Sequence, residues 1–180
     1  MPVHTTTIDG LFVVRSPEHE DNRGFFRESY RLSELREAVG RQVGFVQGNH
    51  SRSVRGVLRG FHAEPWDKLI YVVHGTAFCV VADVRPESPT FGATESFLLG
   101  DWPGLRERLF VAKGLANGFQ AISDCDYVNE VSVEFSPEGR RGFAWDDATL
   151  GVDWPVLPPI LSVHDQSLPT LRGTFGQPVS

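Results

Sequence analysis

Short apolar runs, each bounded by glycine, proline or polar turn residues, recur along most of the chain. Segments 10–17 (GLFVVRSP), 94–100 (TESFLLG) and 107–114 (ERLFVAKG) combine β-branched and aromatic residues in strand-length runs. Further segments of this kind are RGFFRESY (23–30), QVGFVQGNHSRS (42–53), GVLRGFH (56–62), DKLIYVVHGTAFCVVADVR (67–85), GFQAIS (118–123) and YVNEVSVEFSP (127–137). Many short strands at near-regular spacing predict an all-β sandwich or jelly roll.

A single segment has helical spacing. In RLSELREAVG (31–40), Leu32, Leu35 and Val39 share one helical face, and Gly40 is placed to end the helix. The sequence contains no repeats or linkers, so we expect one domain over residues 1–180. The tail after Ser162 is proline-bearing and weakly patterned, and we expect it to cross the surface.

Composition narrows the class of protein. The chain has 180 residues, of which 41% are hydrophobic and 22% charged, as in globular proteins. No run reaches the about 18 apolar residues of a membrane span, and the N-terminus does not read as a secretion signal, so we expect a cytoplasmic protein. Cys79 and Cys125 lack metal-ligand spacing, which favours buried reduced thiols over a zinc site.

The net charge also bears on the ligand. A formal charge of -6 argues against a general nucleic-acid binder, whose affinity rests on clustered lysine and arginine. A small anionic ligand stays open, because a few local cations can hold it in a pocket.

Polar residues alternate in one predicted strand. Gln47, Asn49, Ser51 and Ser53 share one face of FVQGNHSRS (45–53). The plainer interpretation is a face that meets water. The alternative is the inward face of a jelly roll, where amides can orient a ligand in a cavity.

The segment GVLRGFH holds two chemically capable residues. Arg59 and His62 have opposite parity, so a regular strand would turn them to different faces. Gly60 between them permits a bulge that would bring both inward. Arg59 could then bind a phosphate with two hydrogen bonds, and His62 could titrate near neutral pH. If His62 is considered by itself, the plainer interpretation is a hydrogen-bonded structural histidine.

Several segments together resemble one family. The chain is similar to the dTDP-4-dehydrorhamnose 3,5-epimerase family of RmlC-like cupins, which act on nucleotide-linked 4-keto-6-deoxysugars. The resemblance covers nearly the whole chain. It rests on DNRGFFRESY (21–30), QGNHSRS (47–53), GVLRGFH (56–62), DVRPESPTFG (83–92), GFAWDD (142–147) and LSVHDQSLP (161–169).

This resemblance implies a cupin jelly roll with a short peripheral helix and an epimerase mechanism. His62 matches the base that removes a proton beside the C4 ketone, and Asp165 matches the carboxylate that orients it. Lys68 matches a lysine near the keto oxygen, where an ammonium stabilises an enolate. Read alone, Asp165 could be a turn or cap residue.

The resemblance also implies the substrate contacts and the assembly. Arg59 and Arg23 match phosphate-binding positions, and Arg23 would reach a neighbouring subunit's site in a homodimer. Glu28, Gln47 and Asn49 match other substrate-contacting positions. No metal and no cofactor are implied, because the histidine and carboxylate cluster of metal cupins is absent around FHAEP (61–65).

The sequence departs from the family at the position of the general acid, the group that returns a proton to the substrate. Members carry a tyrosine in the strand before the SPE turn, opposite the histidine. Here that position is Asn129, or Glu130 if the alignment shifts by one residue. Tyr127 lies on the same face as Asn129 and could supply a displaced phenol. Phe135 occupies a second position that is often tyrosine.

Other departures gather around the same pocket. Asn117 replaces a histidine, His164 replaces a lysine, and the loop between His62 and Lys68 is short. We therefore expect the reaction to differ from that of the family. It would invert one carbon only, act on an unusual keto sugar, or be a different isomerisation through the same enolate. A keto-sugar isomerase and a catalytically silent nucleotide-sugar binder remain alternatives.

Overall fold

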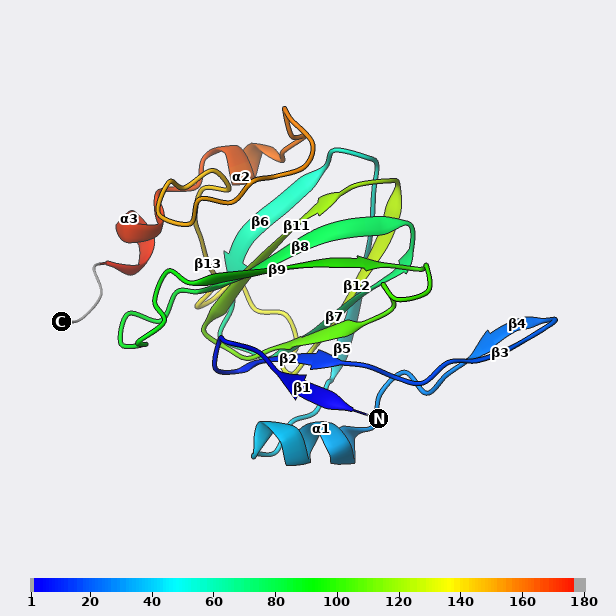
Figure 1. Ribbon diagram of the computed structural model, residues 1–180. Coiled ribbons are helices and arrows are strands. Elements are labelled where there is room, and N and C mark those ends of the chain that lie inside the picture. The colour runs from blue at the N-terminus through cyan, green and yellow to red at the C-terminus, as the bar shows by residue number, and fades with distance from the viewer. Residues whose placement is uncertain (1, 177–180) are drawn as a thin grey trace.

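The computed structural model describes residues 2–176 and places two antiparallel β-sheets face to face (Figure 1). The first sheet has the strand order β1 (Val3–Thr5), β2 (Leu11–Val14), β10 (Arg108–Val111), β7 (Lys68–His74), β12 (Cys125–Val131) and β5 (Gln47–Ser53). The second has the order β13 (Arg141–Gly142), β6 (Leu58–Ala63), β11 (Leu115–Ala121), β8 (Thr76–Asp83) and β9 (Thr94–Gly100). The predicted all-β jelly roll is confirmed.

The longest predicted apolar run, residues 67–85, is two strands rather than one. It reverses at Gly75, where φ is +73° and an added Cβ would lie 2.0 Å from the carbonyl oxygen of Asp124. A glycine is needed there, because other residues disfavour a positive φ and the backbone leaves no room. The turn separates β7 from β8 and sends them into different sheets.

The predicted helix is confirmed as α1 (Leu32–Val39). Its one fully buried residue, Leu35, belongs to the larger of the two hydrophobic core clusters. Gly40 ends the helix in the left-handed conformation, and its backbone N–H donates to the carbonyl of Arg36.

The C-terminal tail lies at the surface, as expected, since most of residues 163–176 are exposed, but it is not irregular. Residues after Ser162 form two short helices, α2 (Val163–Gln166) and α3 (Leu171–Phe175), with Leu171 fully buried. The preceding segment is tied down by Gln120, whose side-chain amide exchanges hydrogen bonds of 2.7 and 2.9 Å with the backbone of Val156. A second apolar cluster, which includes Phe61, Phe143 and Trp154, packs this segment against the second sheet.

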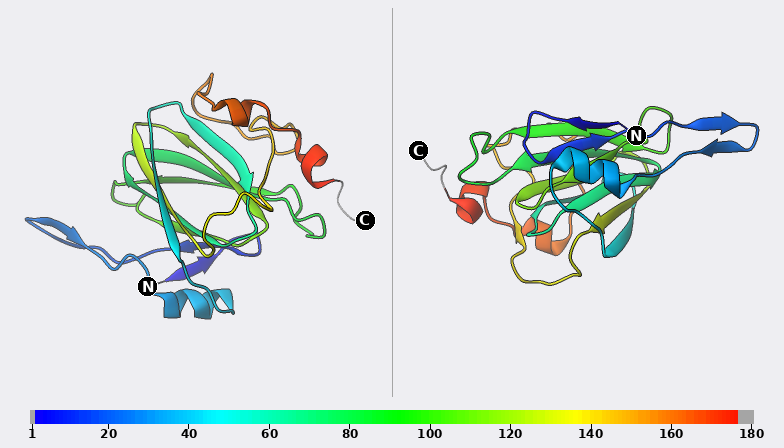
Figure 2. Two further views of the ribbon diagram at one scale, coloured as in Figure 1. Left: turned by 180° about the vertical axis from the view of Figure 1, so that it is seen from behind. Right: turned by 90° about the horizontal axis from the view of Figure 1, so that it is seen from below.

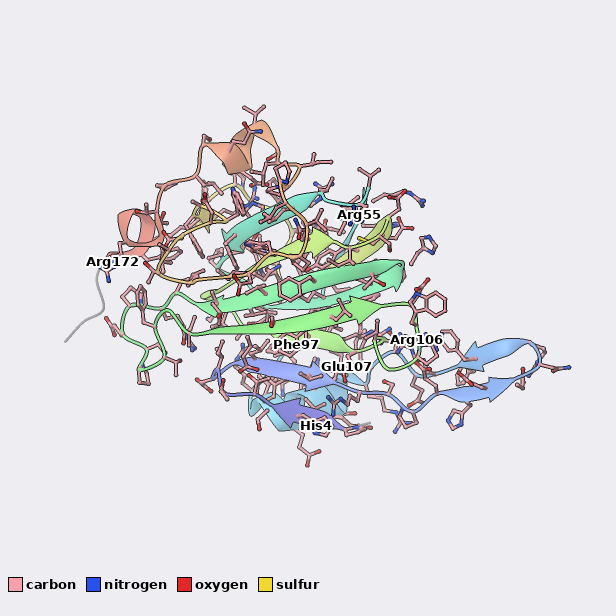
Figure 3. All side chains as sticks on the ribbon, turned by 45° about the horizontal axis from the view of Figure 1, so that its top comes forward. His4, Arg55, Phe97, Arg106, Glu107 and Arg172 are labelled. Atoms are coloured by element: carbon pink, nitrogen blue, oxygen red, sulfur yellow. The ribbon has the colours of Figure 1, made fainter. Side chains whose placement is uncertain are left out.

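A hairpin of β3 (His19–Asp21) and β4 (Gly24–Phe26) projects from the barrel, at the end of the molecule away from α3 (Figure 2). Arg106, labelled in Figure 3, stacks 3.9 Å from the ring centroid of Phe25 at the base of the hairpin. Phe26 leaves 69% of its surface exposed. The hairpin therefore makes few contacts with its own barrel.

Two other sequence expectations can be compared with the described residues. Cys79 and Cys125 are both free and buried, as predicted. Among residues 2–176, no helix has the length and apolar character needed to traverse a bilayer.

Candidate active site

A cavity of about 350 Å³ lies between the two sheets. Its walls come from β5, β6, β7, β11, β12 and α2. It gathers eleven of the thirteen residues singled out from the sequence, namely Gln47, Asn49, Arg59, His62, Lys68, Asn117, Tyr127, Asn129, Phe135, His164 and Asp165. The other two of the thirteen, Arg23 and Glu28, do not line it, and neither does Glu130, the alternative to Asn129.

The bulge predicted at Gly60 is present. Asn117 of β11 pairs with His62 and Phe119 pairs with Arg59, so Gly118 alone lies opposite two residues of β6. The extra residue cancels the opposite parity of Arg59 and His62. Both side chains consequently line the cavity. Gly60 has φ +128°, which strongly favours glycine at this point of the strand.

His62 and Asp165 form a hydrogen-bonded pair. Nε2 of His62 lies 2.8 Å from Oδ1 of Asp165, whose side chain is 5% exposed. The hydroxyl of Ser162 accepts a hydrogen bond from the backbone N–H of Asp165 and caps α2. Burial raises the pKa of Asp165, but the hydrogen bond from His62 and the electrostatic interaction with the His62 ring outweigh burial and lower the pKa below its usual value. The carboxylate is therefore charged beside the imidazole.

Lys68 lines the cavity and is buried, with 3% of its surface exposed. Its ammonium donates hydrogen bonds to the carboxylate of Glu64 and to the side-chain oxygen of Asn117. Burial raises the pKa of Glu64, but the charge of Lys68 and the hydrogen bond from it bring the pKa below its usual value. A buried ammonium is thus held by one charged and one neutral acceptor.

Tyr127 extends this polar chain. The amide of Asn117 donates to the Tyr127 hydroxyl over 3.3 Å, and the Tyr127 ring stacks on Phe119 with 4.0 Å between centroids. Burial, followed by the nearby Cys79 and Glu64 groups, raises the pKa of Tyr127 well above its usual value. The phenol therefore stays protonated and can act as a proton donor.

Amide side chains line the part of the cavity wall that β5 and β12 of the first sheet supply. Gln47 donates to Asn49 over 2.6 Å, and Asn49 donates to Asn129 over 2.8 Å. The backbone N–H of Phe135 donates to the Gln47 side-chain oxygen over 2.8 Å. The polar alternation of β5 therefore faces the cavity, as the second interpretation of that strand proposed.

Glu130, the alternative for the missing tyrosine, lies on the opposite face of β12. Its carboxylate accepts hydrogen bonds from Tyr30 over 2.6 Å and from Tyr71 over 3.0 Å. Because side chains alternate along a strand, Asn129 and Tyr127 face the cavity while Glu130 faces away. The proposal that Glu130 replaces the acid is wrong for this reason.

Arg23 and Glu28 lie outside the cavity of their own chain. Arg23 is in the turn of the β3–β4 hairpin, with 85% of its side chain exposed, and pairs with Asp21. Glu28 follows the hairpin and pairs with Arg31. Their substrate-binding roles stay predictions.

Some residues that line the cavity were missed from the sequence. They are Glu64, Trp66, Phe119, Val131, Arg140 and Ser162. Glu64 could have been found, because it has the same parity as His62, just beyond the end of β6. Arg140 has no such signal, since it lies in the loop before β13 and its place depends on the fold.

Comparisons with known proteins agree with this geometry. Residues 5–173 match the family model described as dTDP-4-dehydrorhamnose 3,5-epimerase. A relative of that name from Shigella flexneri is 38% identical over 176 residues, covering 92% of this chain and 93% of its own length.

Solved structures extend the comparison. NovW, a 4-keto-6-deoxy sugar epimerase from the novobiocin biosynthetic gene cluster of Streptomyces spheroides, superposes with a TM-score of 0.92 at 34% identity, covering 96% of this chain and 88% of its own. ChmJ, a 3'-monoepimerase from Streptomyces bikiniensis in complex with dTDP-quinovose, has a TM-score of 0.87 at 31% identity, covering 93% and 87%. The chain therefore belongs to the dTDP-4-dehydrorhamnose 3,5-epimerase family of carbohydrate isomerases.

Proposed function

We propose that this protein is an epimerase that acts on a dTDP-linked 4-keto-6-deoxyhexose in deoxysugar biosynthesis. The observation that carries the proposal is the His62–Asp165 pair, which shares one cavity with the ammonium of Lys68. The dTDP-quinovose bound by the relative ChmJ supports the class of ligand. Arg59 supplies a cation in the cavity wall for the diphosphate.

The chemistry begins beside the C4 ketone, which acidifies the hydrogens on C3 and C5. One nitrogen of the His62 ring is held by Asp165, and the other accepts the proton from carbon. The electron pair moves into the carbonyl and leaves an enolate, whose oxygen Lys68 stabilises. Asp165 stabilises the imidazolium that forms. Return of a proton to the opposite face of the carbon completes the inversion.

The side chains available on the face of the sugar opposite His62 limit which carbons can be inverted. The amide of Asn129 cannot transfer a proton as a phenol can, and the Tyr127 hydroxyl is buried and accepts a hydrogen bond from Asn117. A positioned acid typically contributes about 10²–10⁴-fold to rate. We therefore propose that inversion is confined to one carbon, with either the Tyr127 phenol or water returning the proton. The relative ChmJ is a 3'-monoepimerase, so the proposed outcome has a parallel in the family.

Deuterium labelling tests this function. The protein is incubated with dTDP-4-keto-6-deoxyglucose in deuterated water, and NMR locates the label. We expect deuterium at one of C3 and C5. Full deuteration at both carbons contradicts single-carbon inversion, no deuterium at either identifies a silent binder, and movement of the ketone to C3 identifies a ketoisomerase.

We also propose that the active form is a homodimer with shared sites. Arg23 is far too exposed to serve its own cavity, and the hairpin that carries it projects from the barrel (Figure 1). A two-fold dimer would place this hairpin, with the exposed Phe26, against the partner, where Arg23 would meet the diphosphate.

A further inference from the structure

Three potential metal ligands meet where α2 borders the cavity. His164 and Asp165 are consecutive in α2, and His62 comes from β6. One ligand atom from each of the three residues lies within 4.8 Å of the others. Within residues 2–176 this is the sole group of three or more histidine, cysteine, aspartate or glutamate side chains gathered this closely. Two imidazoles and one carboxylate form a donor set that suits zinc.

The geometry needs little adjustment to hold an ion. Zinc binds nitrogen and oxygen at about 2.0–2.2 Å, so tetrahedral ligand atoms lie about 3.3 Å apart. His62 Nε2 and Asp165 Oδ1 are 2.8 Å apart, near that separation. The longer edges involve His164, whose ring centroid is 6.4 Å from that of His62 and which is exposed. Its side chain can therefore rotate toward the pair.

We propose that His62, His164 and Asp165 bind a divalent transition-metal ion, with Zn²⁺ the best match, and that the bound ion blocks the base. The ion would bind Nε2 of His62 in place of the proton held toward Asp165, and that proton would move to Nδ1 of the same ring. The nitrogen that accepts the proton from carbon would then have no free lone pair. The binding part stands independently, whereas the inhibition rests on the proposed function. The ion is an inhibitor at this site and supplies no step of the reaction.

The surrounding charges keep this binding reversible. Asp165 contributes a buried carboxylate, and Glu64 adds a second negative charge to the cavity. The cavity wall also contains three positively charged side chains, Arg59, Arg140 and Lys68. Lys68 is paired with Glu64. Cations in the wall weaken the attraction for Zn²⁺, so we expect a chelator to remove the ion readily.

The chain contains its own control. His50 and Asp126 form a similar pair, with His50 Nε2 3.0 Å from Asp126 Oδ1, and His50 is 61% exposed. No third histidine, cysteine or carboxylate ligand completes this pair among the described residues. If a histidine and an aspartate were enough, both pairs would bind the ion. If the third ligand is required, only the group of His62, His164 and Asp165 should bind the ion.

Isothermal titration with Zn²⁺, and with Co²⁺ read by its visible absorption, tests the site on the metal-free protein. We expect one ion per chain, about tenfold or more weaker binding in His164→Ala, and unchanged binding in His50→Ala. The absence of binding in the wild-type protein, equal binding in His164→Ala, or a loss caused by His50→Ala would overturn the proposal. His164 is exposed, so its replacement leaves the fold intact.

Deuterium exchange then tests the inhibition separately. We expect Zn²⁺ to stop exchange at concentrations that saturate the titration, and EDTA to restore it. Unchanged exchange in the zinc-saturated protein refutes the block while the binding site stands. Absence of exchange in the metal-free protein counts against the proposed function and leaves the titration result unaffected.

Discussion

At the scale of single residues, the cavity depends on how the buried side chain of Lys68 is paired. Lys68 is 3% exposed, and burying a charge without a partner costs several kcal/mol. Glu64 supplies the compensating charge, and Asn117 supplies a second acceptor. We therefore propose that Glu64 is a positioning residue, which would act on the substrate through Lys68.

Replacement of Glu64 tests this role. Glu64→Gln keeps an acceptor for Lys68 but removes the charge, and we expect kcat/KM to fall about 10–100-fold, the worth of a charged hydrogen bond. Steady-state kinetics measure the loss. Glu134→Gln, at an exposed position outside the cavity, is the matched control. Wild-type kinetics in Glu64→Gln would show that Lys68 needs no counter-charge.

At the scale of elements, the bulge in β6 is what brings Arg59 and His62 into one cavity. Gly60→Ala would place a Cβ 2.6 Å from the Gly118 Cα, at a φ of +128°. We expect the free energy of unfolding to fall by about 1–3 kcal/mol or more, as measured in urea. Gly48→Ala in β5 meets nothing within 4 Å and should change it by much less. Equal stability of the two variants would contradict this account of the bulge.

The connection that begins at the end of β8 is organised by one buried carboxylate. Asp83 is fully buried and accepts hydrogen bonds from Arg85, Ser88 and Thr90. Burial raises the pKa of Asp83, but the hydrogen bonds outweigh it and lower the pKa from 3.8 to about 2. Because the folded pKa is the lower one, the stabilisation is complete above pH 4 and is lost as the pH falls toward 2.

The pH dependence of stability tests this assignment. Asp83→Asn should unfold more easily at neutral pH by about 2 kcal/mol, which is the free energy equivalent of the pKa shift. The difference from the wild-type protein should shrink between pH 4 and pH 2. Urea denaturation at several pH values measures both. A difference that stays constant with pH would refute the role of the Asp83 charge.

The sequence predicted the elements that carry a local signal, which is a regular spacing of apolar or polar residues or a glycine inside a strand. It did not predict elements without such a signal. The alternation of Gln47, Asn49 and Ser51 predicted a polar strand face, and Gly60 predicted the bulge. Helix α2 escaped prediction because four residues capped by Ser162 show no periodicity. Asp165 meets His62 across 103 residues of chain, a contact expected from the family resemblance rather than from any local pattern.

At the scale of the whole molecule, the proposed dimer can be tested by mixing inactive subunits. His62→Asn lacks the base and Arg23→Ala lacks the borrowed cation, so each homodimer should be nearly inactive. A hybrid dimer would contain one complete site, and an equal mixture should recover about one quarter of the wild-type activity. No recovery, or full activity in Arg23→Ala alone, would contradict shared sites.

The measurement closest to the central claim is deuterium exchange in a variant of the base. His62→Asn should exchange the sugar hydrogen at least about 10²–10⁴-fold more slowly than the wild-type protein. His50→Asn, which alters the exposed His50–Asp126 pair outside the cavity, should exchange at the wild-type rate. Exchange in His62→Asn at the wild-type rate would show that another group removes the proton, and the account of this site would be wrong.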